Sequence, residues 1–256
     1  MNPPKAIGFD LFNTLMTVHP DAMKEAHERQ LRVLHDEKIE VEGEPFGKAY
    51  VEAAVKYIKA AHKDGRETHN RFWVAEALES LGHSLSPDDP RVARAVDAYF
   101  SAFYPNSKLI PGTKEILREL GERYPLGMVS NFTDGPAARK IIEVLELNPF
   151  FQHVLVSGEL GYRKPHPYVF ERFVDAMGVP ADQILFVGDD LDADVKGARD
   201  AGLQPVLTTC VEDTKLPAAK TPLSPTEKEY PNDVPRISSW QDLRDMLEAG
   251  FPRSRE

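Results

Sequence analysis

The sequence predicts an α/β fold built on a parallel sheet, with a separate helical segment inserted early in the chain. Short apolar runs that end in Asp, Ser, Gly or Lys alternate with longer stretches of helical period, which is the pattern of βαβ units. The stretch 18–105 breaks this alternation because it contains no convincing strand. With 256 residues, the chain has room for a core of roughly 150 residues and a smaller attached domain.

Five apolar runs predict five strands, and the stretches between them predict the crossover helices. In chain order the strands cover residues 6–9, 126–129, 154–156, 184–187 and 205–207. The helices cover residues 113–123, 136–147, 167–177 and 193–201, and a closing helix covers 240–247. Between residues 211 and 235, five prolines fall among charged and small residues, so a loop is expected there.

Residues 18–105 have the pattern of consecutive amphipathic helices rich in Ala, Glu, Lys and His. Turn residues at 43–47, at Asp64-Gly65 and at 82–90 divide this stretch, so a bundle of about four helices is expected. We therefore predict a helical domain of residues 18–105 and an α/β domain of residues 1–17 and 106–256.

Composition and charge exclude several classes of protein. The chain is 41% hydrophobic and 28% charged, which is typical of a globular protein. Its net charge of −10 argues against nucleic acid or anionic membrane as a partner. Cys210 is the only cysteine, so no disulfide within the chain is possible, and the N-terminus leaves no room for a signal segment before the first strand. We expect a cytoplasmic monomer or homodimer.

Two candidate sites follow the first two predicted strands. Asp10 stands at the end of the first strand, at the sheet edge where open α/β folds place ligands. A carboxylate there can attack an electrophile and form an acyl intermediate, although Asp is also a common turn residue. Ser130 and Asn131 end the second strand just before a helix; Ser130 could hold a phosphoryl oxygen or merely stabilise the helix entry.

Two further sites follow later strands. Lys164 lies in the loop Gly161–Pro167 beside two prolines and could neutralise charge on a nucleophile and a transferring group; a solvated lysine is the alternative. The fourth site packs four carboxylates into six positions after the strand 184–187. Such like charge is costly without a cation, and oxygen ligands of this kind suit Mg²⁺. Two of the four, Asp190 and Asp192, could instead complement a helix dipole.

Together these four sites resemble the motifs of the haloacid dehalogenase superfamily, in its phosphatase-like branch. The matching pattern is Asp-x-x-x-Thr from Asp10, Ser-Asn at 130–131, Arg-Lys-Pro at 163–165 and Gly-Asp-x-x-x-x-Asp at 188–194. The resemblance covers residues 5–17 and about 109–210. It implies a Rossmann-like core, and the helical insert between the first two motifs is similar to the family's cap domain, which closes over the site and selects the substrate.

The resemblance also implies a role for each matching residue. Asp10 would be the nucleophile, and Lys164 would orient it and stabilise charge. Ser130 and Asn131 would bind the phosphoryl group of a small phosphorylated substrate. Thr14 would belong to the same phosphate-binding group and would support the turn that follows Asp10. The implied cofactor is Mg²⁺, held by the backbone carbonyl of Phe12 and the carboxylates of Asp10, Asp189 and Asp194.

Phe12 departs from the family pattern. Phosphatases of the family usually place a second aspartate at this position, where it protonates the leaving oxygen and then activates water. Its loss typically costs about 10²- to 10⁴-fold in rate, most for alkyl phosphates. Family dehalogenases also lack this aspartate, but they use no metal, whereas Asp189 and Asp194 form a magnesium-type pattern here. A magnesium-dependent phosphohydrolase is therefore favoured; a dehalogenase and a weakly catalytic phospholigand-binding protein are the alternatives.

Several side chains of the helical insert could reach the site. They are His19, His69, Asn70, Arg71 and Trp73. Trp73 at helical spacing is expected to pack in a core and the histidines to be solvated, whereas Arg71 could clamp an anionic substrate.

Overall fold

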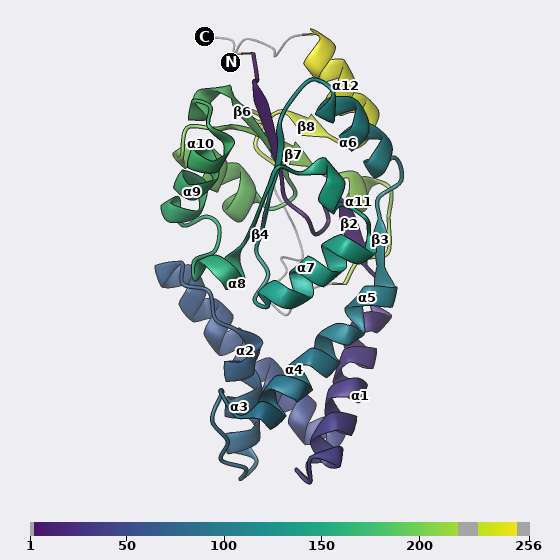
Figure 1. Ribbon diagram of the computed structural model, residues 1–256, viewed down its shortest axis with the longest axis vertical. Coiled ribbons are helices and arrows are strands. Elements are labelled where there is room, and N and C mark those ends of the chain that lie inside the picture. The colour runs from purple at the N-terminus through teal and green to yellow at the C-terminus, as the bar shows by residue number, and fades with distance from the viewer. Residues whose placement is uncertain (1–2, 220–229, 250–256) are drawn as a thin grey trace.

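The computed structural model describes residues 3–219 and 230–249, and its centre is a six-stranded parallel sheet in the order β5-β4-β1-β6-β7-β8 (Figure 1). All five predicted strands are confirmed. A sixth, β8, is two residues long and has no apolar run that would predict it. The strands are β1 Ala6–Phe9, β4 Leu126–Ser130, β5 His153–Val156, β6 Ile184–Gly188, β7 Gln204–Thr208 and β8 Arg236–Ile237.

The register of the central strands aligns their carboxyl ends. Phe9 at the end of β1 pairs with Met128 of β4 on one side and with Val187 of β6 on the other. Because the three strands are parallel, the residues that follow them emerge at one edge of the sheet. This alignment places three of the four predicted sites at the same edge.

Helices cover both faces of the sheet, as a Rossmann-like fold requires. In Figure 1, α9 and α10 lie on one face, and α6, α7 and α12 lie on the other. The predicted helix 193–201 is a π-helical turn, η3, that continues into α10. The bounds are α6 Thr113–Gly121, α7 Gly135–Val144, α8 Ser157–Leu160, α9 Pro167–Met177, η3 Leu191–Lys196, α10 Gly197–Asp200 and α12 Trp240–Ala249; short 3₁₀ turns η1 and η2 cover Asn148–Phe150 and Ala181–Gln183.

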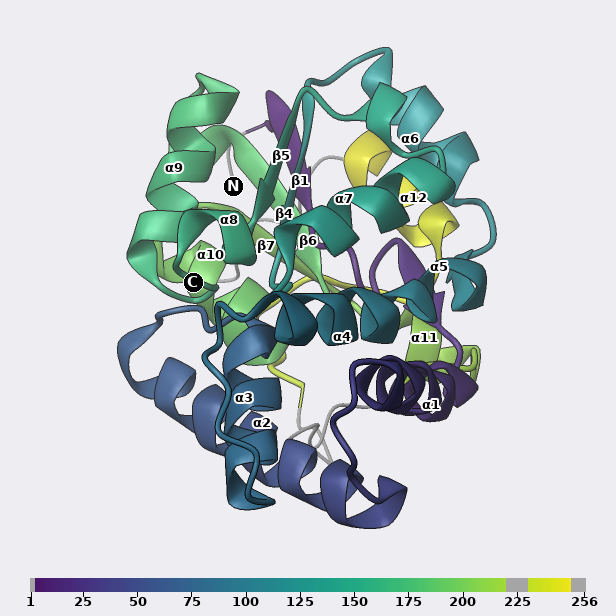
Figure 2. The same cartoon turned by 60° about the horizontal axis from the view of Figure 1, so that its bottom comes forward.

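The four expected helices of the insert are present and lie beyond the carboxyl edge of the sheet (Figures 1 and 2). The turn predicted at 43–47 is wrong, because these residues form the first turns of α2, where Phe46 is fully buried. The turn at Asp64-Gly65 is confirmed, and Gly65 ends α2 with a positive φ of 70°. The helices are α1 Asp21–Asp36, α2 Gly43–Asp64, α3 Asn70–Ser80 and α4 Pro90–Ser101.

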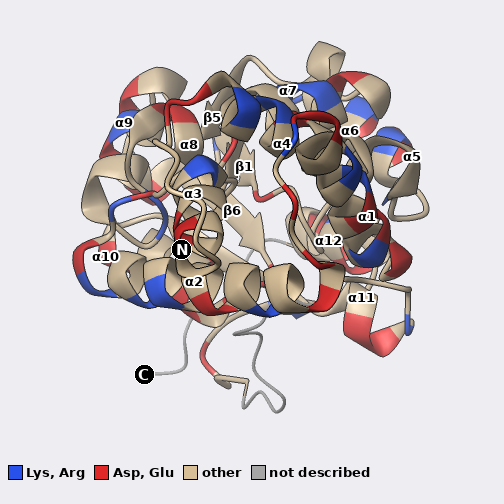
Figure 3. Ribbon diagram, turned by 90° about the horizontal axis from the view of Figure 1, so that it is seen from below, with Lys and Arg blue, Asp and Glu red and all other residues tan. Residues whose placement is uncertain are grey.

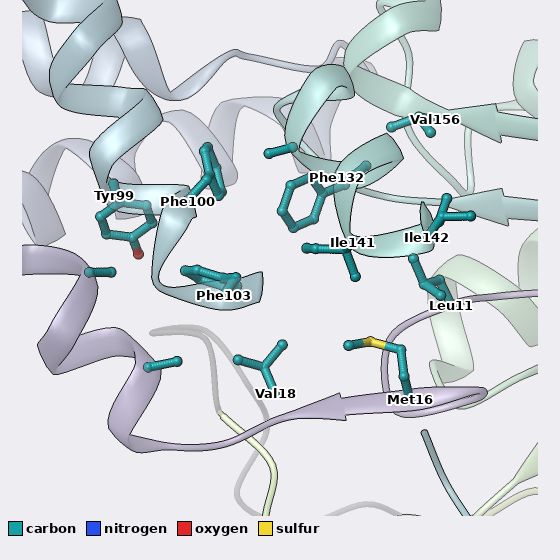
Figure 4. Close-up of a cluster of buried hydrophobic side chains, with 14 of the residues drawn as sticks. Leu11, Met16, Val18, Tyr99, Phe100, Phe103, Phe132, Ile141, Ile142 and Val156 are labelled. Atoms are coloured by element: carbon teal, nitrogen blue, oxygen red, sulfur yellow. The ribbon is translucent and has the colours of Figure 1, made fainter. Parts of the chain in front are cut away.

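A short antiparallel ribbon joins the two ends of the helical insert to the sheet. It consists of β2 (Met16–Val18) and β3 (Ser107–Leu109), and α5 (Phe103–Asn106) precedes it. Beside the ribbon, Phe100 and Phe103 pack on Phe132, which follows β4 (Figure 4). A single buried apolar cluster therefore runs from the sheet into the helical insert.

Acidic and basic residues are interspersed over the helical insert when it is seen from below (Figure 3), which is typical of a solvated surface. Within the described residues, no helix combines the length and the apolar character needed to cross a membrane. The expected loop 211–235 opens with α11 (Cys210–Asp213), and its residues 220–229 lie outside the described part of the chain.

Candidate active site

Three carboxylates converge at the carboxyl edge of the sheet. Asp10 follows β1, Asp189 follows β6, and Asp194 lies in η3; one oxygen from each lies within 4.8 Å of the others. The backbone N–H of Asp10 donates to the carbonyl of Val187 at 2.9 Å, which extends the pairing of β1 and β6 into the site. The structure therefore brings together the first and fourth predicted sites.

Lys164 completes this cluster through its ammonium group. Its Nζ donates to Asp10 Oδ1 at 2.7 Å, to Asp194 Oδ1 at 2.6 Å and to the carbonyl of Val129 at 2.8 Å. The residue is only 2% exposed, so the alternative of a solvated lysine is wrong. All three ammonium protons have acceptors, which fixes the position of the charge beside Asp10.

The electrostatics of the cluster show an excess of negative charge. Burial disfavours the charged form of Lys164, but Asp10 and Asp194 outweigh this effect and raise the pKa of the ammonium above its ordinary value. Burial raises the pKa of Asp194, against the opposing effect of Lys164. Three carboxylates with one ammonium suit a divalent cation bound by oxygen ligands, so the residues fit Mg²⁺.

The turn after β6 is shaped to bring Asp194 back onto the strand. A Cβ at Gly188 would lie 2.3 Å from the Asp194 carboxylate carbon, so only glycine allows this approach. Asp194 Oδ2 accepts from the N–H of Asp190 at 3.0 Å. Asp190 is exposed, and its carboxylate accepts hydrogen bonds from the N–H groups of Asp192 and Ala193. It therefore caps the start of η3, which agrees with the alternative that this carboxylate complements a helix dipole.

Two buried hydroxyl groups near the carboxylate cluster are typical of a ligand site, because they lack hydrogen-bond partners. Ser130 Oγ and Thr14 Oγ1 are fully buried, and neither has a hydrogen-bond partner among the described residues. An unsatisfied buried hydroxyl typically costs about 1–3 kcal/mol. An anionic oxygen bound at the site would satisfy such donors.

Asn131 holds the backbone of Lys164 through its whole side-chain amide. Its Nδ2 donates to the Lys164 carbonyl at 2.9 Å, and its Oδ1 accepts from the Lys164 N–H at 2.8 Å. The Asn131 side chain is therefore occupied in locating the lysine. This pairing ties the second predicted site to the third.

Phe12 lies in the turn after β1, and its ring stacks on Phe132. The ring centroids are 5.1 Å apart and the planes differ by 2°. Each ring lies two residues after a predicted site residue: Phe12 follows Asp10, and Phe132 follows Ser130. The position where family phosphatases carry an acid is therefore part of the apolar contact between the sheet edge and the helical insert.

Residues of the insert make polar contacts with the loop after β4. His69 Nε2 lies 3.1 Å from Asp134 Oδ2, and Thr133 Oγ1 donates to Asn70. The His69 side chain is 31% exposed, so it is half-buried against the core and less solvated than expected. Arg71 pairs with Asp88 inside the insert at 2.7 Å, and Trp73 is buried as expected.

Glu67 and Asp134 make contacts near the site that the sequence does not predict. Glu67 lies in the loop between α2 and α3 and contacts Ser157 and Arg163 of the core. Asp134 follows the second motif by three residues, and only its capping pattern before the predicted helix 136–147 distinguishes it in the sequence. Glu67 carried no periodic or motif signal.

Comparisons with known proteins agree with this geometry. Residues 4–202 match the family model of the haloacid dehalogenase-like hydrolases. The chain is 28% identical over 240 residues to ribulose-1,5-bisphosphate 5-phosphatase of Halopiger xanaduensis, covering 93% of this chain and 98% of that protein. It is 36% identical over 124 residues to glyceraldehyde 3-phosphate phosphatase of Pyrococcus abyssi, which is 47% of this chain and about half (51%) of that protein's length.

Solved structures share the fold. A phosphatase of this superfamily from Thermococcus onnurineus superposes with a TM-score of 0.62 at 19% identity, covering 95% of this chain and 97% of that one. The 2-haloacid dehalogenase of Pseudomonas syringae pv. Tomato superposes with a TM-score of 0.67 at 20% identity, covering 96% and 99%. These neighbours support the architecture and do not distinguish the chemistry. The family match and the sequence relatives show that the chain is a haloacid dehalogenase-like hydrolase of the phosphatase-like branch.

Proposed function

We propose that this protein is a magnesium-dependent phosphohydrolase that acts on a small phosphorylated metabolite through an aspartyl-phosphate on Asp10. The observation that carries the proposal is the placement of a buried lysine against Asp10 and Asp194, with Asp189 in the same carboxylate cluster. The names of the sequence relatives, which specify phosphorylated sugars, support the class of substrate.

In the first step, an Asp10 oxygen attacks phosphorus while the bond from phosphorus to the leaving oxygen breaks and that oxygen takes the electron pair. Lys164 holds Asp10 in line and balances charge on the phosphoryl group. The Ser130 hydroxyl donates a hydrogen bond to a phosphoryl oxygen, Asn131 keeps the lysine in place, and Thr14 supports the turn. In the second step, water attacks phosphorus while the bond from phosphorus to the Asp10 oxygen breaks, and Asp10 takes the electron pair and becomes a carboxylate again. A proton of the water passes to solvent, and inorganic phosphate leaves.

The magnesium ligands in this proposal are Asp10, Asp189 and the backbone carbonyl of Phe12, with Asp194 helping to hold the ion. When bound, Mg²⁺ neutralises the anionic substrate and polarises the phosphoryl group. The proposal also divides the chain as the sequence predicts, into a core of residues 1–17 and 106–256 and a cap of residues 18–105. A cytoplasmic location and a monomeric or homodimeric state remain predictions.

Because Phe12 cannot donate a proton, the rate of the first step should depend strongly on the leaving group. We expect kcat/KM with Mg²⁺ to be about 10²- to 10⁴-fold higher for aryl and acyl phosphates than for alkyl phosphates. Product release from a panel of these esters, with Mg²⁺ or with EDTA, measures this difference. EDTA should abolish turnover of every member of the panel.

The same panel separates the competing functions. Turnover that persists in EDTA would contradict the role of magnesium. If no phosphate is hydrolysed but halide is released from 2-haloacids, the protein is a dehalogenase, as Phe12 allows. If neither reaction occurs but phosphate esters bind, the protein is a phospholigand-binding member of the family.

A further inference from the structure

The cap touches the core at a second place, far from the ribbon through which the chain enters and leaves it. In Figure 1, the end of α2 reaches the core beside α8, whereas α1 and α5 meet it at β2 and β3. The loop between α2 and α3, residues 65–69, makes this contact. Arg66 and Tyr162 form an antiparallel bridge, the N–H of Glu67 donates to the Gly161 carbonyl at 3.0 Å, and the N–H of Arg163 donates to the Gly65 carbonyl at 2.9 Å.

Glu67 is the most buried charge in this contact. Its side chain is 3% exposed. Ser157 Oγ donates to Glu67 Oε2 at 2.6 Å, and Arg163 Nη1 lies 3.5 Å from Glu67 Oε1. A buried carboxylate without such partners would be costly. The two core residues therefore compensate the burial of the Glu67 carboxylate when the cap loop contacts the core.

Both partners of Glu67 lead directly to the catalytic groups. Ser157 Oγ accepts from the N–H of Phe132 at 2.8 Å, so a chain of hydrogen bonds connects Glu67 to the turn that carries Ser130. Arg163 precedes Lys164, whose ammonium contacts Asp10. One carboxylate from the cap thus contacts the phosphate-binding turn through Ser157 and the lysine loop through Arg163.

We propose that Glu67 is a positioning residue that couples docking of the cap to the geometry of Ser130 and Lys164. This inference rests on the proposed function, because it concerns the phosphoryl-transfer geometry of the same site. With Glu67 in place, the turn after β4 and the loop before α9 are held at one separation. Without it, the two loops remain joined through Asn131 but lose their shared contact with the cap, and the phosphoryl group is aligned less well with Asp10.

The test compares Glu67→Gln and Glu67→Ala with wild type and with Glu79→Gln, a control at an exposed position of the same cap. Two quantities are measured: kcat for p-nitrophenyl phosphate with Mg²⁺, and the dissociation constant of orthovanadate with Mg²⁺ by calorimetry. We expect kcat to fall about 10- to 100-fold and vanadate binding to weaken about tenfold, since small misplacements of reacting groups have effects of this size. KM should change less than kcat, and Glu79→Gln should match wild type.

A double-variant cycle with Ser157→Ala distinguishes positioning from a loss of folding. If Glu67 acts through Ser157, Glu67→Ala and Ser157→Ala together lower kcat by much less than the product of their separate losses. Glu67 variants that bind vanadate and turn over within twofold of wild type would overturn the inference while leaving the proposed function intact. Multiplicative losses in the cycle would also overturn it. If wild type shows no turnover, vanadate affinity alone decides the inference, and a wild type that does not bind vanadate contradicts both proposals.

Discussion

Asp10→Asn is expected to lower phosphatase turnover by at least about 10⁴-fold, because an amide cannot form the covalent intermediate that divides the reaction into two steps. Binding of phosphate should persist, since Ser130 and Lys164 remain. The substitution also removes one of the two carboxylates that Lys164 Nζ contacts. Steady-state kinetics and phosphate titration of the same preparation measure both properties.

The matched control for this prediction is Asp192→Asn, which changes an exposed carboxylate in the turn that contains Asp194. Its turnover should equal that of wild type. If Asp10→Asn retained more than about one-hundredth of wild-type turnover on any phosphate ester, Asp10 could not be the nucleophile for that ester.

Lys164→Met should have the second-largest effect, on stability and on activity together. Removing the ammonium leaves Asp10 and Asp194 buried without their shared partner, a change that typically costs about 3–5 kcal/mol. Turnover should fall by about 10²- to 10³-fold, because the charge beside the transferring group is lost. Urea unfolding with and without Mg²⁺ measures the first effect, and Mg²⁺ should recover part of the lost stability.

Lys196→Met is the control, because Lys196 pairs with Asp200 at an exposed position; its stability should stay within about 0.5 kcal/mol of wild type. Lys164→Arg keeps the charge and should fold where Lys164→Met does not, yet its larger head group should still lower turnover. Wild-type turnover in Lys164→Met would contradict the role assigned to the lysine.

The strands and the carboxylate cluster were predictable from the sequence for one physical reason. Parallel strands bring their carboxyl ends to one edge, so Asp10 and Asp189 emerge on the same side of the sheet, and they meet because β1 pairs with β6. The unusual density of carboxylates after β6 also indicates a cation site from the sequence alone. Local pattern and topology were sufficient here because each signal lay within a few residues of a strand end.

Features that depend on contacts between distant segments were not predictable. The strands β2, β3 and β8 are two or three residues long, too short for an alternating pattern to identify. Gly43 and Gly47 suggested a turn, but the buried face that includes Phe46 and Tyr50 favours a helix there. Glu67 is distinguished only by its contacts with Ser157 and Arg163, which are remote from it in sequence.

The central claim is the covalent intermediate on Asp10, and trapping it is the most direct test. Since Phe12 supplies no base for the second step, the intermediate should accumulate with an activated aryl phosphate and give a burst of aryl alcohol. Acid quenching during turnover with Mg²⁺, followed by borohydride reduction and peptide mass spectrometry, should convert residue 10 to homoserine in wild type but not in Asp10→Asn. Turnover that proceeds with residue 10 unmodified and no burst, or with the phosphoryl group on another residue, would contradict the account.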